Sequence, residues 1–316
     1  MASARRIDFH FHLIPKFYQD AAYESDTGPA IGRYPDWSPE RALELMDAHS
    51  IEVALTSLAQ PGVQFGSPEH GRALARRCND YAAGLAARWP RRFGGFAVVP
   101  MWDMRHAIDE IGYALDQLKL QGVCLFASYG EKYLGDPHFD PVLEALNGRD
   151  AVVFVHPALH PSSRALDLPW PGFMMEYLFD TTRATVNLVF SGAMERFPRI
   201  RFVLAHAGGL VPYFAWRLSV SPMIDARLPQ IPPDQIFARL RQFWYDIALS
   251  PKPQTIACLA DIAAPDRIVF GSDWPFANAK VVAEALRTYE TSAPMTDHER
   301  LAIDRANALS LFPQFG

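Results

Sequence analysis

Residues 5–15 read RRIDFHFHLIP, and this stretch decides the prediction of the fold. Read as a β-strand with a period of two, it places Asp8, His10 and His12 on one face. The other face is apolar, which indicates a covering layer of helices; its members are Ile7, Phe9, Phe11 and Leu13. Because unpaired imidazoles are costly to bury, two histidines in register favour a metal site. The alternative is that one histidine is an ordinary core residue and the other lies in a loop.

The composition is that of a globular chain with a large core. Its 316 residues are normal for a single α/β barrel, so we expect one domain over residues 1–316. Apolar residues make up 49% and charged residues 21%, which argues against a disordered chain. The net charge of -5, with acidic and basic residues spread along the chain, offers no basic stripe for nucleic acid or a membrane surface. The expected partner is therefore a small molecule.

The cysteines and the N-terminus indicate in which cellular compartment the protein is expected. Cys78, Cys124 and Cys258 lie far apart and lack the spacing of a metal site, so they are expected to be free thiols in a reducing environment. The N-terminus has no signal-type apolar region, and no apolar run is long enough to span a bilayer. We therefore expect a soluble cytoplasmic protein.

Eight short apolar segments alternate with helical patterns along the chain. The predicted strands lie within residues 5–15, 51–58, 92–100, 122–128, 151–157, 201–209, 242–250 and 267–275. This alternation is typical of a parallel sheet, and eight units predict a closed (β/α)8 barrel, a TIM barrel. The competing open, doubly wound sheet would usually carry a glycine-rich turn after its first strand, and the turn here is His-Leu-Ile-Pro instead.

Two long connections are expected to act as lids. Residues 14–37 follow the first strand and residues 158–176 follow the fifth, and neither segment shows a clear period. Aromatic side chains in and beside the lids would suit a flat ring as ligand. These residues are Phe17, Tyr18, Trp37, Trp170, Phe173, Trp274 and Phe276. They would serve equally well to pack the loops.

Polar side chains gather at the C-terminal ends of four predicted strands. They are His10 and His12 on the first strand, His156 on the fifth, His206 on the sixth and Asp273 on the eighth. A closed barrel brings these ends to one mouth. Imidazole and carboxylate donors without a thiolate suit zinc, manganese, iron or cobalt in a catalytic site. Each residue alone has an ordinary structural explanation, such as a bond to a backbone carbonyl. Asp8 is expected to support the ligands rather than to bind the metal.

The motifs IDFHFH, VFVHP, VLAHAGG and FGSDWPF resemble those of the amidohydrolase superfamily. Within it, the chain is similar to the metal-dependent, non-oxidative decarboxylases that include aminocarboxymuconate semialdehyde decarboxylase and γ-resorcylate decarboxylase. The stretches PDWSPERALELMD, YGEKYLGDP, FDTTRATVNLVFSGAMERFPRIRF and ANALSLF are most similar to the 6-methylsalicylate decarboxylase group. The resemblance covers essentially the whole chain, and its motifs are more specific for the branch than for the substrate.

The resemblance implies roles for single residues. It implies that the catalytic metal is held by four ligands, His10, His12, His156 and Asp273. His206 would be the acid/base residue, with Asp273 as a second candidate for the proton donor. Arg217 matches an arginine that, in the family, binds the substrate carboxylate from a neighbouring subunit. Without the resemblance, Arg217 would be read as an ordinary arginine on a helix surface. The fourth strand lacks the lysine that binuclear relatives carboxylate, so a single metal ion is implied.

The implied reaction is the non-oxidative decarboxylation of a salicylate-type aromatic acid. The implied cofactor is one divalent metal ion, zinc first and manganese second, and the implied assembly is a homodimer or homotetramer. Two other functions remain open from the sequence. A metal-dependent hydrolase or lactonase would use the same site to activate water against a ring-derived carboxylate. A ligand-binding barrel would hold a small molecule without turnover.

Overall fold

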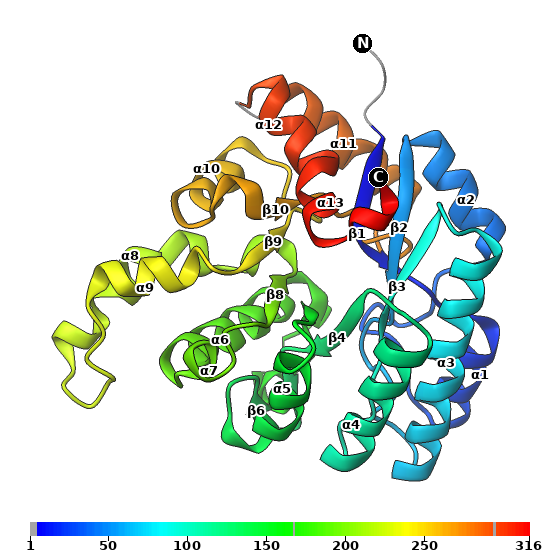
Figure 1. Ribbon diagram of the computed structural model, residues 1–316, viewed down its shortest axis with the longest axis horizontal. Helices are drawn as coiled ribbons and strands as arrows, with labels where there is room; N and C mark the ends of the chain where they lie inside the picture. The colour runs from blue at the N-terminus through cyan, green and yellow to red at the C-terminus, as the bar shows by residue number, and fades with distance from the viewer. Residues whose placement is uncertain (1–4, 167, 293–294) are drawn as a thin grey trace.

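The protein is a parallel barrel surrounded by helices, in a computed structural model that describes residues 5–166, 168–292 and 295–316 (Figure 1). The strands lie in the order β1-β2-β3-β4-β7-β8-β9-β10. Their bounds are β1 Arg6–His12, β2 Ile51–Ser57, β3 Phe93–Ala97, β4 Gly122–Phe126, β7 Val152–His156, β8 Arg201–Leu204, β9 Trp244–Asp246 and β10 Ile268–Val269. Every neighbouring pair is parallel, which confirms the predicted (β/α)8 architecture.

The last strand returns to the first and closes the barrel. The backbone N–H of Phe9 donates to the carbonyl of Phe270, and that of His12 donates to Trp274, at N···O distances of 2.9 and 2.7 Å. The N–H of Asp273 donates to the carbonyl of His10 at 2.7 Å. Two histidines and an aspartate from opposite ends of the sequence thus lie on hydrogen-bonded neighbouring segments.

Strict alternation along β1 was a wrong prediction for its first half. Three steps from Asp8 to Phe11 oppose two steps on β2, so the strand contains a β-bulge. Phe9 consequently packs inside the barrel against Phe96, which packs against Phe154, and the ring of Phe154 contacts His10. Beyond the bulge, Phe11 packs outward as predicted. The bulge lets an apolar floor and two inward histidines come from one short strand.

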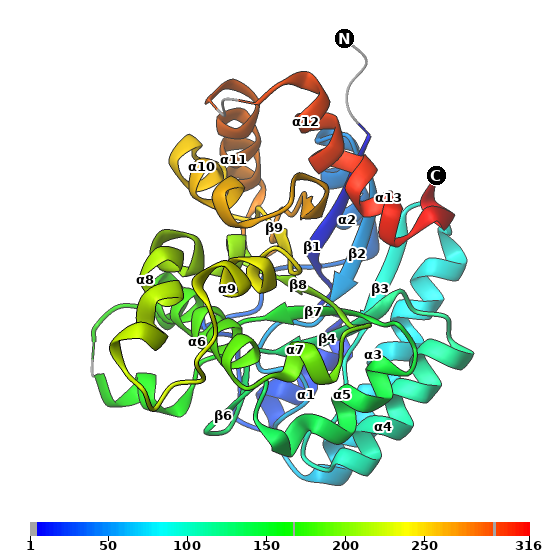
Figure 2. The same ribbon diagram turned by 60° about the vertical axis from the view of Figure 1, so that its left-hand side comes forward.

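Helices cover the outside of the barrel in chain order (Figure 2). They are α1 Lys16–Glu24, α2 Pro39–Ala48, α3 Pro68–Arg88, α4 Met104–Gly112, α5 Asp140–Asn147, α6 Glu176–Phe190, α7 Ala193–Arg196, α8 Val211–Ile224, α9 Pro233–Leu240, α10 Pro253–Ile262, α11 Ala279–Ser292, α12 Asp297–Leu301 and α13 Asn307–Leu311. Leu311 and Phe312 at the end of α13 join the inner apolar cluster and close the bottom of the barrel. Among the described residues, no helix is long and apolar enough to cross a membrane.

The two predicted lids differ in structure. Residues 14–37 do not form one irregular loop, because α1 occupies Lys16–Glu24. Tyr18 and Ala22, four residues apart, bury one side of this helix, and the Gly- and Pro-rich stretch after it hid that short pattern in the sequence. The segment after β7 contains 3-10 turns at Pro161–Leu166 and Gly172–Met174 before α6 begins. A small antiparallel hairpin, β5 Ser128–Tyr129 with β6 Lys132–Tyr133, follows β4.

Candidate metal centre

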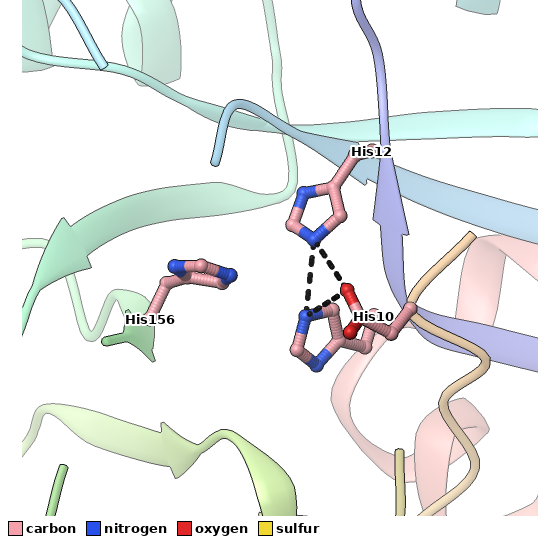
Figure 3. A group of neighbouring side chains, drawn as sticks. His10, His12 and His156 are labelled. Atoms are coloured by element: carbon pink, nitrogen blue, oxygen red, sulfur yellow. Dashed lines mark hydrogen bonds and ion pairs between the residues drawn. The ribbon is translucent and has the colours of Figure 1, made fainter. Parts of the chain in front are cut away.

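The predicted site residues converge at the C-terminal mouth of the barrel. His10 and His12 lie on β1, His156 ends β7, and Asp273 lies four residues beyond β10. One ligand-type atom from each of these residues lies within 4.8 Å of the others, and all four side chains are buried. In Figure 3 the rings of His10 and His12 lie together, and His156 faces them from across the site.

Three lone-pair atoms form a tight triangle in this cluster. The Nε2 atoms of His10 and His12 are 3.1 Å apart. Oδ1 of Asp273 lies 3.0 Å from Nε2 of His12 and 3.3 Å from Nε2 of His10. Donors bound at about 2.1 Å from one ion lie roughly 3 Å from each other. The spacing of these three atoms therefore suits three ligands of a single metal ion.

Backbone oxygens orient two of the imidazoles. Nδ1 of His12 lies 3.2 Å from the carbonyl oxygen of Ser57, and Nδ1 of His156 lies 2.8 Å from that of Pro157. A carbonyl only accepts, so each Nδ1 carries the proton and each neutral ring turns its Nε2 lone pair toward the cluster. Such bonds fix the tautomer that a metal ligand needs.

Asp246, the last residue of β9, binds the His10 imidazole and the backbone of His206, and it was not predicted from the sequence. Its Oδ2 accepts a hydrogen bond from Nδ1 of His10 at 2.8 Å. Its Oδ1 accepts the backbone N–H groups of His206 and Ala248, both at 2.9 Å. Nδ1 of His206 lies 3.2 Å from the carbonyl oxygen of Ala248. His206 therefore also presents Nε2 to the mouth when neutral.

The charges in the cluster are strongly coupled. Burial alone lowers the pKa of His10, but Asp246 and Asp273 outweigh it and raise that pKa to about 10. Burial would raise the pKa of Asp273, and the charge of His10 instead holds it well below its usual value. Burial lowers the pKa of His156 and of His206. Two buried carboxylates thus demand positive charge between the imidazoles, which a proton on His10 or a metal ion provides.

Two site residues have left-handed backbone conformations. His206 has a φ of 53° and Asp273 a φ of 64°. Non-glycine residues adopt this region at a cost, and such strain persists mainly where the surrounding structure fixes it. The N–H groups of both residues are fixed, His206 by Asp246 and Asp273 by the carbonyl of His10.

Asp8 lies beneath the cluster, in a supporting position. Its Oδ1 accepts the backbone N–H groups of His10 and Ser272, at 3.0 and 3.1 Å. Its Oδ2 has no hydrogen-bond partner in the described part of the chain. Burial raises the pKa of Asp8 to about 7. Asp8 therefore joins β1 to the segment after β10 without itself entering the cluster.

A cavity of about 480 Å³ opens over the cluster and is lined by His156, His206 and Asp273. Most of the remaining wall is apolar and comes from both predicted lids and from the loops after β9 and β10. It includes Ile31, Phe173, Met174, Leu178, Leu249 and Phe276. Three polar side chains not predicted from the sequence, Gln60, Tyr177 and Ser250, also line this cavity. The wall suits a compact, largely apolar ligand whose polar atoms face the histidines.

Only two of the seven predicted aromatic residues line this cavity. Phe173 and Phe276 face it. Tyr18, Trp37 and Trp274 are buried in the packing around the barrel. The other two, Phe17 and Trp170, lie elsewhere, the first partly buried beside α3 and the second exposed. The alternative prediction, that these aromatics pack the loops, holds for the buried ones.

Arg217 lies outside the site of its own chain. It is an exposed residue of α8 and is not part of the cavity lining. The same helix carries large exposed apolar side chains: Trp216 is 72% exposed, Met223 75% and Ile224 78%. The structure therefore places Arg217 within an exposed apolar helix face rather than beside the four candidate ligands.

Proteins of known sequence and structure resemble this chain along nearly its full length. Decarboxylase yanB of Aspergillus niger is 36% identical, over 98% of this chain and 88% of that protein. The 6-methylsalicylic acid decarboxylase acuB of Aspergillus aculeatus is 34% identical, over 98% of this chain and 96% of that protein. The crystal structure of 5-carboxyvanillate decarboxylase LigW from Sphingomonas paucimobilis superposes with a TM-score of 0.84 at 27% identity, over 98% of this chain and 99% of that chain.

The family model for amidohydrolases matches residues 7–314, which include β1 at one end and the closing segment after β10 at the other. The resemblance predicted from the four histidine and aspartate motifs is thereby confirmed. The chain belongs to the amidohydrolase family.

Proposed function

We propose that this protein is a carboxy-lyase, a metal-dependent, non-oxidative decarboxylase that removes CO2 from a hydroxylated, salicylate-type aromatic acid. The observation that carries the proposal is a buried cluster of three histidines and an aspartate that opens into a mostly apolar cavity. The named relatives that align with almost the whole chain are decarboxylases, one of them of 6-methylsalicylic acid. These relatives favour decarboxylation over the hydrolase alternative.

The donor set fits one divalent ion. His10, His12, His156 and Asp273 would hold it, because their donor atoms converge and the Nδ1 atom of each imidazole is already engaged. The ion would act as a Lewis acid that stabilises negative charge on the substrate oxygens. Three nitrogen donors and one carboxylate without a thiolate favour zinc, with manganese as the alternative that metal analysis distinguishes.

The chain's own residues would supply orientation and protons. Protonation of the ring carbon that carries the carboxylate breaks aromaticity. Departure of CO2 then returns the electron pair of the broken C–C bond to the ring. Nδ1 of His206 is occupied by the carbonyl oxygen of Ala248, which leaves Nε2 available to the substrate. His206 would therefore act as the acid/base group. Asp273, which lines the same cavity, is the second candidate to carry that proton.

We also propose that two copies of the chain assemble through α8. The cavity lining contains no lysine or arginine among the described residues, although the proposed substrate is an anion. Arg217 is the cation of an exposed apolar helix face that includes Trp216 and Met223. A symmetric dimer through this face would bury the apolar residues and deliver the arginine of one copy to the carboxylate in the other. A homotetramer would be built from the same pair.

We also propose a single catalytic domain and a cytoplasmic location. Residues 1–316 would act as one catalytic barrel domain, and the family model spans almost all of them. A cytoplasmic location is supported by free thiols, because Cys78 and Cys124 are buried and unpaired, and Cys258 is exposed and unpaired.

The direct test is product analysis with 6-methylsalicylate. Decarboxylation predicts equal amounts of CO2 and 3-methylphenol, and loss of both after chelation of the metal. A His206→Asn variant should bind metal normally but react much more slowly, by about 100-fold or more. Hydrolysis of a lactone by a protein that leaves the aromatic acid unchanged would refute the proposal. Full activity in His206→Asn would refute the role of that residue.

A further inference from the structure

The cavity over the metal cluster contains few polar groups besides the cluster itself. In the described part of its lining these are the side chains of Gln60, Tyr177 and Ser250. None of the three carries a positive charge. Within its own chain, a carboxylate bound in this cavity away from the candidate metal ligands can take hydrogen bonds only from such neutral groups among the described lining residues, in addition to the arginine proposed to come from a second copy.

Gln60 and Tyr177 form a hydrogen-bonded pair at the edge of this cavity. The Tyr177 hydroxyl, in the first turn of α6, donates to Oε1 of Gln60 at 2.9 Å. Gln60 lies three residues after β2, on a different side of the mouth. This bond leaves the two N–H groups of the Gln60 amide without an acceptor among the described residues. The pair consequently offers free N–H donors to the cavity.

The donor character does not depend on how the amide is oriented. Exchanging the amide oxygen and nitrogen of Gln60 would reverse its bond to Tyr177. The Tyr177 hydroxyl would then accept from the amide and turn its own proton elsewhere. In both arrangements at least one N–H of the Gln60 amide remains available to donate to a ligand in the cavity.

The pair lies close to the candidate metal ligands. The ring of Tyr177 packs edge-on against His156, with centroids 6.0 Å apart and planes at 73°. Gln60 also lines a second cavity of about 650 Å³, so it stands at the boundary between the two spaces. Gln60 and His156 line the same cavity, so a ligand bound beside His156 has the Gln60 side chain on the wall of its site.

We propose that Gln60 binds the carboxylate of the aromatic acid by donating an amide N–H to it, and that Tyr177 is a positioning residue that holds Gln60 for this bond. The proposal rests on the proposed function for the identity of the ligand. It adds the contact that would orient the carboxylate group relative to the ring. A purely structural alternative treats the pair as a tie between the loop after β2 and α6.

The test measures binding of two small probes to the metal-loaded protein by calorimetry. Benzoate has the carboxylate but no hydroxyl, and phenol has the ring and hydroxyl but no carboxylate. Gln60→Met removes the donor while keeping the size and the neutral charge of the side chain. It should weaken benzoate binding about tenfold and leave phenol binding within about twofold, because a hydrogen bond to a charged group is lost only for benzoate.

Gln64→Met is the matched control. Gln64 lies on the same loop, lines the neighbouring cavity and donates to the carbonyl of Val99 at 3.4 Å. Its replacement should leave the binding of both probes unchanged. Unchanged benzoate binding in Gln60→Met, or equal weakening of benzoate and phenol, would overturn the proposal. So would a wild-type protein that does not bind benzoate.

Tyr177→Phe separates positioning from direct contact. It should weaken benzoate binding by about threefold and add nothing further in the Gln60→Met background. In turnover, both variants should raise KM more than they lower kcat. Additive effects of the two substitutions would contradict the positioning role. Because benzoate binding is measured without turnover, failure of the wild type to decarboxylate any aromatic acid would refute the proposed function and leave the binding test intact.

Discussion

Nδ1 of His10 and Oδ2 of Asp246 are 2.8 Å apart, and both side chains are fully buried. The same carboxylate accepts the backbone N–H of His206 through its other oxygen. One residue at the end of β9 therefore orients a proposed metal ligand and the segment that carries the proposed acid/base residue. The two proposed roles are thus joined through one carboxylate.

Replacing Asp246 should weaken metal binding without removing a ligand. In Asp246→Asn, the amide oxygen can accept either from His10 or from the N–H groups of His206 and Ala248, and the other set of donors then faces the amide NH2. The carboxylate charge that makes the imidazole a better donor is also lost. We expect metal affinity to fall about 10- to 100-fold, with a parallel loss of decarboxylation at limiting metal. Competition with a chromogenic chelator measures the affinity. An Asp246→Asn protein with wild-type metal affinity would show that the bond is not coupled to the metal.

Asp8 should matter for folding and much less for metal. Asp8→Ala leaves the buried N–H groups of His10 and Ser272 without their acceptor, and should lower the free energy of unfolding by roughly 2–4 kcal/mol. Asp8→Asn keeps an acceptor oxygen and should cost less than about 1 kcal/mol. Denaturant unfolding of the two variants checks this order. Loss of the metal from a folded Asp8→Asn protein would instead identify Asp8 as a ligand.

The sequence predicted the four convergent residues because each is a polar side chain at or near the C-terminal end of an apolar strand. His10, His12, His156 and Asp273 all stand out by this contrast, and the barrel geometry then brings them together. Asp246 ends a strand in the same way, yet it could not be separated from an aspartate that caps the following segment. Its bond to His10 depends on the distance between β9 and β1, which local pattern does not contain.

Two other features were hidden for physical reasons. The bulge at Asp8–Phe11 adds one residue to a pairing register, and neither the composition nor the alternating polar and apolar residues of the sequence reveal it. Gln60 is a neutral amide in a loop, and it gains a partner only because α6 brings Tyr177 beside it. Long-range pairing decides both features, whereas the strands and the (β/α)8 order follow from local patterns.

Disruption of the apolar face of α8 should dissociate the assembly. Trp216 is exposed, so Trp216→Glu should leave the fold intact while placing a charge in the proposed interface. Sedimentation should change from dimer to monomer, and decarboxylation should fall because Arg217 no longer reaches a second cavity. Circular dichroism controls for the fold. A variant that remains dimeric, or a wild-type protein that is monomeric, would refute this interface.

Mixed assemblies test whether Arg217 acts across subunits. Arg217→Ala and His156→Ala chains should each be nearly inactive alone. In a randomly mixed dimer population, half the molecules pair the two variants and each contains one complete site. The mixture should therefore recover roughly a quarter of wild-type activity. Absence of recovery after confirmed subunit exchange would place the role of Arg217, if any, in its own chain.

Asp180 should make stability depend on pH. Burial outweighs the hydrogen bonds from the Ala158 N–H and the Ser128 hydroxyl and raises the pKa of Asp180 from 3.8 to about 6. The folded protein therefore holds this proton more tightly than the unfolded chain does. The resulting stabilisation is complete below pH 3.8 and is lost as the pH rises through about 6.

Asp180→Asn removes this titration. Its stability relative to the wild type should increase between about pH 4 and pH 7 by up to roughly 3 kcal/mol. Denaturant unfolding at several pH values measures the difference. A difference that is constant across this range, or that grows toward acidic pH, would contradict the assignment.

The most direct test of the central claim is titration of metal-free protein with zinc while CO2 release from a salicylate-type acid is recorded. A single catalytic ion held by His10, His12, His156 and Asp273 predicts that activity rises linearly and stops at equimolar metal. His12→Ala should fail to reach that activity at the same metal concentration. Decarboxylation by protein shown to be metal-free, or an endpoint at two ions per chain, would contradict the account.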